Sequence, residues 1–553
     1  MAVLPLGEAI ARFTRPGMAI HLGYGGGRPN AAVAELIRRY RGTSPGFTVS
    51  AHGFVNTQHA LVAAGLVRRL VVAYAGENYP SPRPNPALQR AVRDGSVEVA
   101  SWSLWTLTAR LVAGALGVEF FPVRSLAGSG MAAEHEGTDY RTVEAFDGTT
   151  GVVRAYRPDL VLLQGIAADT DGNVLLPPPY GEGAWGALAA REGVIACVER
   201  IVDADVIRAH NSLPSVPAHV VRAVCVTPFG SHPYGMDTGG LADVPGYGED
   251  EPFMAGLRRA AKRPDTFDEW ISEWVIGPTS HEEFLALLGS QRLDGLLADS
   301  RAEAASRTGP PSEDERMTMA AVRVLRDRVA VAGHDIVLSG IGFAHLAAWT
   351  AVSGLRAQGT AVQLAAELGM SGFTPLPGDP YLFARQNLPT SLRLTDVMGV
   401  LARDVSGPAT SSIGVLGAGQ MDREGNINST WSAGGDYLVG SGGANDVASA
   451  ADEVVVVVKH ARDRMVDHVG YVTAPGHRVS TVVTSQAVLE RQGDAFTVVR
   501  FLADTDTRSA IAQIQADTGW DIAVRPDVAR EPPPDPADLT LLRSYDPAGV
   551  FLR

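Results

Sequence analysis

The stretch GAGQMDREGNINSTWSAGGDYLVGSGGAND at residues 417–446 joins an Asp-x-x-Gly-Asn turn to the glycine cluster GSGG at 440–443. A backbone with so few side chains can bring its N–H groups close to a ligand or form an unusual turn. The Asp-x-x-Gly-Asn pattern occurs once more, as DTDGN at 169–173. The repeat predicts that the chain consists of two related halves that meet around a site.

Each half shows the same order of elements around this pattern. An apolar run leads through glycines into a helical pattern at 18–40 and again at 335–357. After its Asp-x-x-Gly-Asn turn, each half continues into another apolar run, at 193–202 and at 452–461. Continuous apolar runs are typical of strands buried on both faces, and their alternation with helices indicates parallel sheets. The sequence therefore predicts an α/β fold with two similar α/β/α domains and largely parallel sheets.

Other elements and the boundary between the halves follow from composition. Further strands are expected at 67–75, 158–167 and 334–342, and helices at 31–40, 104–116 and 343–357. A chain of 553 residues exceeds what one hydrophobic core usually supports. The polar segment at 299–316, with two prolines at its centre, is typical of a linker. The predicted domains are 1–298 and 317–553, and the proline-rich segment 530–539 is expected to be an extended strap.

Composition argues against several functions. The formal net charge of −14 disfavours a nucleic-acid groove or an anionic membrane surface. The chain has no run of about 18 apolar residues, and its start lacks the features of a signal peptide. Cys197, Cys225 and the thirteen histidines show no metal-ligand spacing. We expect a cytoplasmic protein without a metal, a membrane anchor or a nucleic-acid partner.

Three features are candidates for chemistry. The turn GYGGGRPN at 23–30 lacks the spacing of a dinucleotide fingerprint, so it either borders another ligand or is purely structural. The cluster GSGGAND at 440–446 offers N–H donors for an oxyanion, with an ordinary glycine turn as the alternative. Glu367 follows an apolar run and precedes glycines, where an α/β fold places chemistry. A surface or helix-capping glutamate is the alternative reading of Glu367.

These motifs, in this order, resemble the family I coenzyme A transferases, most closely the glutaconate CoA-transferase type, with the α and β subunits fused in one chain. The first half is similar to the α subunit in PGMAIHLGYGGGRPN (16–30), GVEFFPVRSLAGSGM (117–131) and PDLVLLQGIAADTDGNV (158–174). The second half is similar to the β subunit in ELGMSGF (367–373), VLGAGQMDREGNINST (415–430), GSGGANDVAS (440–449) and HVGYVTAPG (468–476). The resemblance covers nearly the whole chain.

The resemblance implies that CoA moves from an acyl-CoA donor to a carboxylic acid acceptor by a ping-pong mechanism, through a glutamyl-CoA thioester. Glu367 matches the family's nucleophile, and Gly442 and Gly443 match the backbone donors of its oxyanion hole. The residues expected to line the substrate are Gly25, Gly26, Gly27, Gly440, Gln420 and Asn445. Coenzyme A is implied as a substrate, with no tightly bound cofactor and no metal, and a homodimer is compatible with the resemblance.

A nucleophilic carboxylate must be ionised, so the pKa of Glu367 is expected not to be raised far. Other reactions on the same fold stay open, namely acyl-CoA hydrolysis, decarboxylation and ring opening. The absence of a carboxylate at 101–107 argues mildly against ring opening. A protein that binds a CoA ligand without catalysis is the alternative from a different class.

Overall fold

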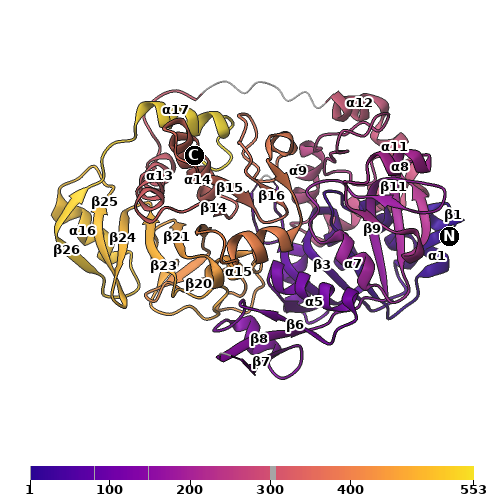
Figure 1. The fold of residues 1–553 in the computed structure, drawn as a ribbon, viewed down its shortest axis with the longest axis horizontal. Coiled ribbons are helices and arrows are strands. Elements are labelled where there is room, and N and C mark those ends of the chain that lie inside the picture. The colour runs from indigo at the N-terminus through magenta and orange to yellow at the C-terminus, as the bar shows by residue number, and fades with distance from the viewer. Residues whose placement is uncertain (1, 80, 147, 299–306) are drawn as a thin grey trace.

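The computed structural model describes residues 2–79, 81–146, 148–298 and 307–553. It contains two large β-sheets, one in each half of the chain, with helices packed around them (Figure 1). In the described part of the chain, no helix is both long and apolar enough to cross a bilayer. The α/β class predicted from the sequence is confirmed, and both sheets are largely parallel.

The sheet of the first half has the order β1-β13-β11-β9-β2-β3-β4-β5, and every neighbouring pair on this path is parallel. Its strands are β1 (Ala2–Val3), β2 (Ala19–Leu22), β3 (Phe47–Val55), β4 (Val67–Gly76), β5 (Glu98–Ser101), β9 (Leu160–Ala168), β11 (Val194–Ile201) and β13 (Val221–Val226). Two short strands, β10 (Val174–Leu175) and β12 (Ser215–Val216), extend it in antiparallel pairing. Every residue of β9 is buried, as expected for a strand covered on both faces.

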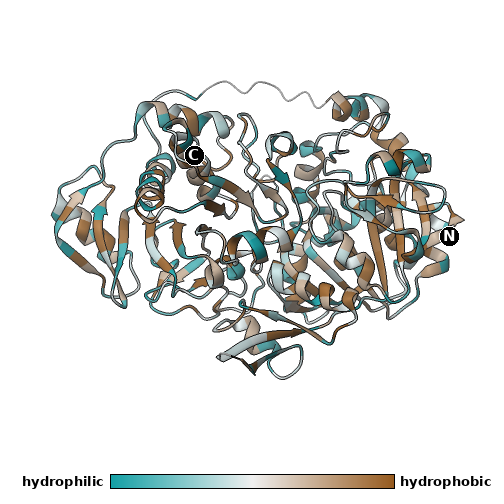
Figure 2. Ribbon diagram, viewed as in Figure 1, coloured by the Kyte–Doolittle hydropathy of each residue, from teal (hydrophilic) through white to brown (hydrophobic). Residues whose placement is uncertain are grey.

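The sheet of the second half has the order β17-β16-β15-β14-β18-β21-β23-β24-β25-β26. Its strands are β14 (Ile336–Ser339), β15 (Gln363–Ala366), β16 (Met370–Ser371), β17 (Arg393–Leu394), β18 (Ser412–Gly417), β21 (Glu453–Val458), β23 (Val479–Thr484), β24 (Ala487–Gln492), β25 (Ala495–Phe501) and β26 (Ala523–Arg530). The centre, from β15 to β23, is parallel, and the pairs next to it on both sides are antiparallel. Figure 2 shows apolar residues along the central strands of both halves.

Helices pack around both sheets, and the three helices predicted from the sequence are among them. Three agree with the expected positions, namely α2 (Asn30–Tyr40), α5 (Leu104–Leu116) and α14 (Phe343–Ala357). The others in the first half are α1 (Leu6–Phe13), α3 (His59–Ala63), α4 (Pro86–Arg93), α6 (Gly130–His135), α7 (Gly183–Ala189), α8 (Ala204–Ala209), α9 (Glu251–Ala260), α10 (Pro264–Ile271), α11 (His281–Leu288) and α12 (Ser290–Ala298). The second half adds α13 (Glu313–Ala332), α15 (Ala444–Ala450), α16 (Thr507–Ala516) and α17 (Pro536–Tyr545).

The Asp-x-x-Gly-Asn turn has the same hydrogen bonds in both halves. Asp169 accepts hydrogen bonds from the backbone N–H and the side-chain amide of Asn173, at 2.9 and 2.8 Å. Asp422 accepts the same two bonds from Asn426, at 2.9 and 3.2 Å. The glycine before each asparagine has a positive φ, +98° and +88°, which explains why glycine recurs there. The repeated motif therefore marks the same turn in two similar halves.

Two segments differ from the sequence-based expectation. The strap predicted at 530–539 is wrong, because β26 ends at Arg530 and α17 begins at Pro536, where a proline suits the first helical turn. Asp535 caps this helix by accepting from backbone N–H groups. A three-stranded sheet of β6 (Phe120–Val123), β8 (Gly148–Arg154) and β7 (Tyr140–Ala145), in that order, was not expected and projects from the first half (Figure 1).

The predicted linker at 299–316 overlaps regular structure at its end. Helix α13 begins at Glu313, and the Ser312 side chain caps it by accepting from the Glu315 N–H. Residues 299–306 lie outside the described residues.

Candidate active site

Glu367 lies at the end of a central strand of the second sheet. It follows β15 directly and opens the tight connection to the antiparallel strand β16. Gly369 closes this connection with a φ of +125°, and a side chain there would collide with the carbonyl of Thr395. The hairpin therefore positions Glu367 at the carboxyl end of β15, as the sequence predicts.

The carboxylate of Glu367 lies against the glycine cluster. A β-carbon built on Gly443 would be 2.6 Å from Glu367 Oε2, and one on Gly442 would be 3.9 Å from Oε1. The N–H of Gly442 donates to the carbonyl of Ala73 at 2.9 Å, so it is already engaged. Among the described residues the N–H of Gly443 has no hydrogen-bond acceptor. Of the two predicted oxyanion donors, Gly443 alone has a free N–H in this arrangement.

The first half of the chain holds the glycine cluster in place. The Ala75 N–H donates to the carbonyl of Val439 at 2.9 Å, just before the cluster. The Leu104 N–H donates to the carbonyl of Gly442 at 3.0 Å, so the start of α5 also binds the loop. The site therefore forms where the end of β4 and the start of α5 meet the second half.

A second carboxylate, that of Asp446, is buried beside the same loop. It accepts hydrogen bonds from Ser103 Oγ at 2.6 Å and from the Trp105 N–H at 3.0 Å, both at the start of α5. Burial raises the pKa of Asp446 to about 6. Burial, and then the charge of Asp446, raise the pKa of Glu367 to about 8. The expectation that the pKa of Glu367 is not raised far is therefore wrong, because two carboxylates share one enclosed site.

A cluster of two histidines and a glutamate lies under the first glycine turn. Glu182 Oε1 is 3.1 Å from His21 Nε2, and Glu182 Oε2 is 3.1 Å from His52 Nδ1. Burial alone would raise the pKa of Glu182, but His52 and His21 outweigh it and lower that pKa to about 2. His52 Nε2 lies 3.2 Å from the carbonyl of Leu104, which can only accept, so this nitrogen carries a proton.

The same three side chains are the group of residues that could hold a metal ion, since their ligand atoms lie within 4.8 Å of one another. The carboxylate lies at ion-pair distance from both imidazoles, although Glu182 Oε2 and His52 Nδ1 have no hydrogen-bond partner among the described residues. Sequence spacing missed it because its members come from β2, β3 and the start of α7. Its position links the first glycine turn to Leu104, the residue that binds the carbonyl of Gly442.

The first glycine turn packs against its own half of the chain. A side chain on Gly26 would collide with the carbonyl of Pro178, and one on Gly27 would be 3.0 Å from the carbonyl of Gln164. Gly25 is less crowded, with the Tyr180 carbonyl 3.5 Å from a built β-carbon. Gly26 also lines a pocket between the halves. Close packing explains Gly26 and Gly27 but not Gly25, and the predicted contact of all three with substrate stays a prediction.

The other three residues predicted to line the substrate bind the protein itself. Gln420 donates to the carbonyl of Asp463 at 2.9 Å and accepts from Asn428 at 3.1 Å. Asn445 accepts from the Leu126 N–H at 2.9 Å, which ties the two halves together. Gly440 sits in a β-bridge with Tyr74 of β4. In this arrangement the geometry favours a structural role for all three.

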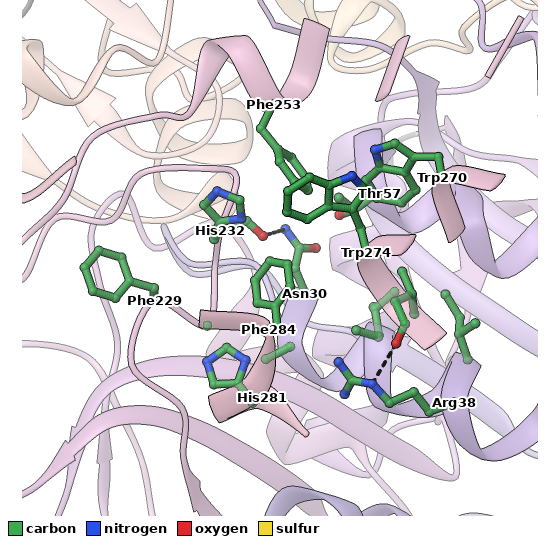
Figure 3. Close-up of a pocket in the computed structure, with 16 residues that line it drawn as sticks. Asn30, Arg38, Thr57, Phe229, His232, Phe253, Trp270, Trp274, His281 and Phe284 are labelled. Atoms are coloured by element: carbon green, nitrogen blue, oxygen red, sulfur yellow. Dashed lines mark hydrogen bonds between the residues drawn. The ribbon is translucent and has the colours of Figure 1, made fainter. Parts of the chain in front are cut away.

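An aromatic pocket in the first half does not belong to the site. Figure 3 shows its walls, which include Phe253, Trp270 and Trp274, and every residue that lines it comes from 30–284. Asn30 Oδ1 and His232 Nδ1 are buried there and have no hydrogen-bond partner in the described part of the chain. The space measures about 40 Å³, which suits a few buried waters at roughly 10–15 Å³ each rather than an organic ring.

Comparison with known proteins decides the family. Residues 4–226 match the model of the coenzyme A transferase family. The chain is 30% identical over 289 residues to one subunit of 3-oxoadipate CoA-transferase from Pseudomonas knackmussii, covering 51% of this chain and 97% of that subunit. The chain belongs to the coenzyme A transferase family. This CoA-transferase carries both types of subunit in one polypeptide, because a further 156 residues, 24% of the chain, are 30% identical to the other subunit of that enzyme and cover 58% of it.

The fold agrees with this assignment. A crystal structure of an acyl-CoA transferase from Escherichia coli O157:H7 superposes with a TM-score of 0.68, covering 96% of this chain and 95% of that one. The sequence identity of that pair is 14%, so the likeness is one of fold. The chain thus has the CoA-transferase fold, and the resemblance inferred from its motifs is confirmed.

Proposed function

We propose that this CoA-transferase transfers CoA from an acyl-CoA donor to a carboxylic acid acceptor through a covalent thioester on Glu367. The observation that carries the proposal is the closeness of the Glu367 carboxylate to Gly443: a β-carbon built there would be 2.6 Å from Oε2, and the Gly443 N–H has no acceptor among the described residues. A nucleophile beside a preorganised N–H donor is the arrangement that acyl transfer requires.

The first half-reaction starts at Glu367. One carboxylate oxygen attacks the thioester carbon of the donor, and the resulting oxyanion lies near the Gly443 N–H. The intermediate collapses to a mixed anhydride and releases CoA as its thiolate. The thiolate then attacks the glutamyl carbonyl carbon, which expels the donor acid together with one oxygen of Glu367. The enzyme is left as a glutamyl-CoA thioester.

The second half-reaction runs the same steps in reverse. The acceptor carboxylate attacks the glutamyl thioester and displaces the CoA thiolate, again through a mixed anhydride. The thiolate attacks the acceptor acyl carbon and regenerates the carboxylate of Glu367, which keeps one oxygen from the acceptor. Both anhydrides are sensitive to water, so the burial of the site between the two halves protects them.

Oxygen-18 in the solvent tests this route against direct hydrolysis. In labelled water with donor and acceptor present, transfer predicts a donor acid that gains no oxygen from the solvent in the first turnover. Incorporation of one solvent oxygen in every turnover would contradict the proposal. Glu367→Gln should abolish transfer, because an amide is a poor nucleophile.

Thioester hydrolysis is the second candidate, and the raised pKa of Glu367 favours it. A carboxylate with a pKa of about 8 is a suitable general base for a water molecule. Hydrolysis predicts thiol release without any acceptor acid, together with labelling of the donor acid by solvent. Transfer predicts no release of free thiol under those conditions, because CoA stays on Glu367, and at most one donor acid per active site.

A further inference from the structure

We propose that His52 is a positioning residue for the transfer reaction, because it anchors the start of helix α5, which holds Asp446 and the peptide group before Gly443. The inference rests on the proposed function of Glu367. His52 lies in β3, and only 2% of the residue is exposed. It acts on the reacting groups through α5, which joins the first half of the chain to the glycine cluster.

One nitrogen of His52 binds the first turns of α5. Nε2 lies 3.2 Å from the carbonyl oxygen of Leu104 and 2.8 Å from the hydroxyl oxygen of Thr108. The Thr108 hydroxyl donates its own proton to the Leu104 carbonyl, at 2.8 Å, so its oxygen is free to accept from His52. Nε2 therefore carries a proton that is directed at two acceptors of α5.

The other nitrogen of His52 faces a buried carboxylate. Nδ1 lies 3.1 Å from Glu182 Oε2, and the other oxygen of Glu182 accepts from the Tyr24 N–H and lies 3.1 Å from His21 Nε2. The side chains of His52 and Glu182 are almost completely buried, so the imidazole ring is enclosed between this carboxylate and α5. The enclosure gives the Nε2–H one direction, because the partner of one ring nitrogen sets the role of the other.

The start of α5 carries the donors that hold the second half of the chain. The first N–H groups of a helix have no acceptor within the helix. Here the Leu104 N–H donates to the carbonyl of Gly442, and the Trp105 N–H donates to Asp446, both at 3.0 Å. The Ser103 hydroxyl, which caps the helix, donates to the other oxygen of Asp446 at 2.6 Å. A shift of the helix start would therefore displace Asp446 and the Gly442 carbonyl together.

One of these bonds orients the free N–H of the site. The carbonyl of Gly442 and the N–H of Gly443 belong to one trans peptide group, in which they point in opposite directions. Because the Leu104 N–H holds the carbonyl, the direction of the Gly443 N–H is fixed as well. A β-carbon at Gly443 would lie 3.6 Å from Leu104 Cδ1 and 2.6 Å from Glu367 Oε2. The position of Leu104 therefore sets the direction of the donor beside Glu367.

His52 also acts on the second carboxylate of the site through space. Burial raises the pKa of Asp446 to about 6, while the hydrogen bonds from Ser103 and Trp105 and the electrostatic effect of His52 oppose that rise in pKa. Asp446 in turn adds to the effect of burial on the pKa of Glu367. The electrostatics therefore connect His52 to the same carboxylate that the hydrogen bonds reach through α5.

Two neutral amides that differ by one methylene test the inference. The amide of glutamine reaches about as far as Nε2 of histidine, whereas that of asparagine reaches only about as far as Nδ1, so His52→Gln keeps a donor for Leu104 and His52→Asn loses it. Single turnovers with a donor acyl-CoA and no acceptor are followed by the mass of the intact protein. His52→Asn should lower the rate constant of adduct formation on Glu367 about 10²-fold, the effect of a misplacement of about 1 Å. His52→Gln should recover most of that rate.

The half-saturating concentration of the donor should stay the same in both variants, because His52 positions the reacting groups and not the bound donor. His460→Asn is the matched control. His460 is a buried histidine of the second half whose ring nitrogens lie 2.9 and 3.1 Å from the hydroxyls of Thr484 and Thr518. This substitution should leave the rate constant of adduct formation unchanged.

A purely structural role for His52 predicts a different pattern, namely a smaller final yield of adduct with an unchanged rate constant. That pattern would overturn the inference, as would equally slow adduct formation in His52→Gln and His52→Asn. If His52→Asn does not fold, His52→Met takes its place, because methionine has about the reach of glutamine and no N–H donor. Absence of the adduct on the wild-type chain would contradict the Glu367 mechanism itself, and the inference with it, so the two failures are distinguished.

Discussion

The carboxylate of Glu367 occupies the space that a side chain at Gly443 would need. A β-carbon at Gly443 would be 2.6 Å from Glu367 Oε2 and 3.2 Å from Cδ. The backbone of Gly443 has a φ of −86°, which any residue can adopt, so conformational freedom does not require glycine there. The position of the Glu367 carboxylate is what requires glycine at residue 443. The structure thus brings together Glu367 and the glycine cluster at 440–443, which are far apart in the sequence.

Gly443→Ala should displace the Glu367 carboxylate from the free N–H. We expect transfer to fall by about 10²–10³-fold, the usual effect of losing one oxyanion donor. Gly434→Ala is the matched control, because Gly434 lies in an exposed loop shortly before the cluster and a β-carbon there meets only Ser432 Oγ, at 3.7 Å.

The steric origin of this effect is measured by a double-mutant cycle. The cost of Gly443→Ala in unfolding free energy should shrink in a Glu367→Ala background, because the clashing carboxylate is gone. Equal changes in unfolding free energy in both backgrounds would show that the methyl group introduced by Gly443→Ala does not clash with the Glu367 carboxylate.

The rate of adduct formation should rise with pH. The attacking group is the ionised carboxylate, and the pKa of Glu367 is about 8 because of burial and the charge of Asp446. The single-turnover rate should therefore reach half its maximum near pH 8. Asp446→Asn removes the neighbouring charge and should move that midpoint to lower pH. A flat profile between about pH 6 and 9 would contradict the assigned pKa.

Glu367 should lower the stability of the protein at high pH. Its folded-state pKa of about 8 lies above the unfolded value, so the folded state retains a proton that the unfolded state has lost. Stability therefore falls as pH rises from the unfolded pKa through about 8. Glu367→Gln should raise the unfolding temperature at about pH 9 and change it little at about pH 4. A lower unfolding temperature for Glu367→Gln than for the wild-type protein at high pH would contradict the predicted direction of the effect.

Glu182→Gln should destabilise the first half. The ionised carboxylate is fully buried between His21 and His52, and the loss of one partner from a buried charged cluster costs about 3–5 kcal/mol. Glu192→Gln is the control, since Glu192 pairs with Arg15 at the surface, and it should change the unfolding temperature little. Because the pKa of Glu182 is lowered to about 2, its contribution is present above the unfolded pKa and is lost as pH falls through about 2.

Much of the fold could be predicted because the signals are local. Strands β9 and β21 are continuous apolar runs, and helices α5 and α14 have the bounds that their sequence patterns indicate. The position of Glu367 at the end of a strand also follows from its immediate neighbours. The linker and domain boundaries stay predictions, although α13 begins within the segment assigned to the linker.

The electrostatics of the site could not be predicted, because its groups come from distant parts of the chain. Asp446 was visible only as the end of the glycine stretch, and its partners Ser103 and Trp105 lie in the other half. The hydrogen bond from the Gly442 N–H to the carbonyl of Ala73 likewise joins the second half of the chain to the first.

The mass of the intact protein tests the central claim most directly. The enzyme is mixed with a donor acyl-CoA in the absence of acceptor, quenched with acid and analysed by mass spectrometry, with Glu367→Gln in parallel. The proposed mechanism predicts that the wild-type chain gains CoA less one water, at a site that borohydride reduction and peptide mapping assign to Glu367. Steady release of free thiol with no adduct on the wild-type chain, or an adduct of equal yield on Glu367→Gln, would contradict it.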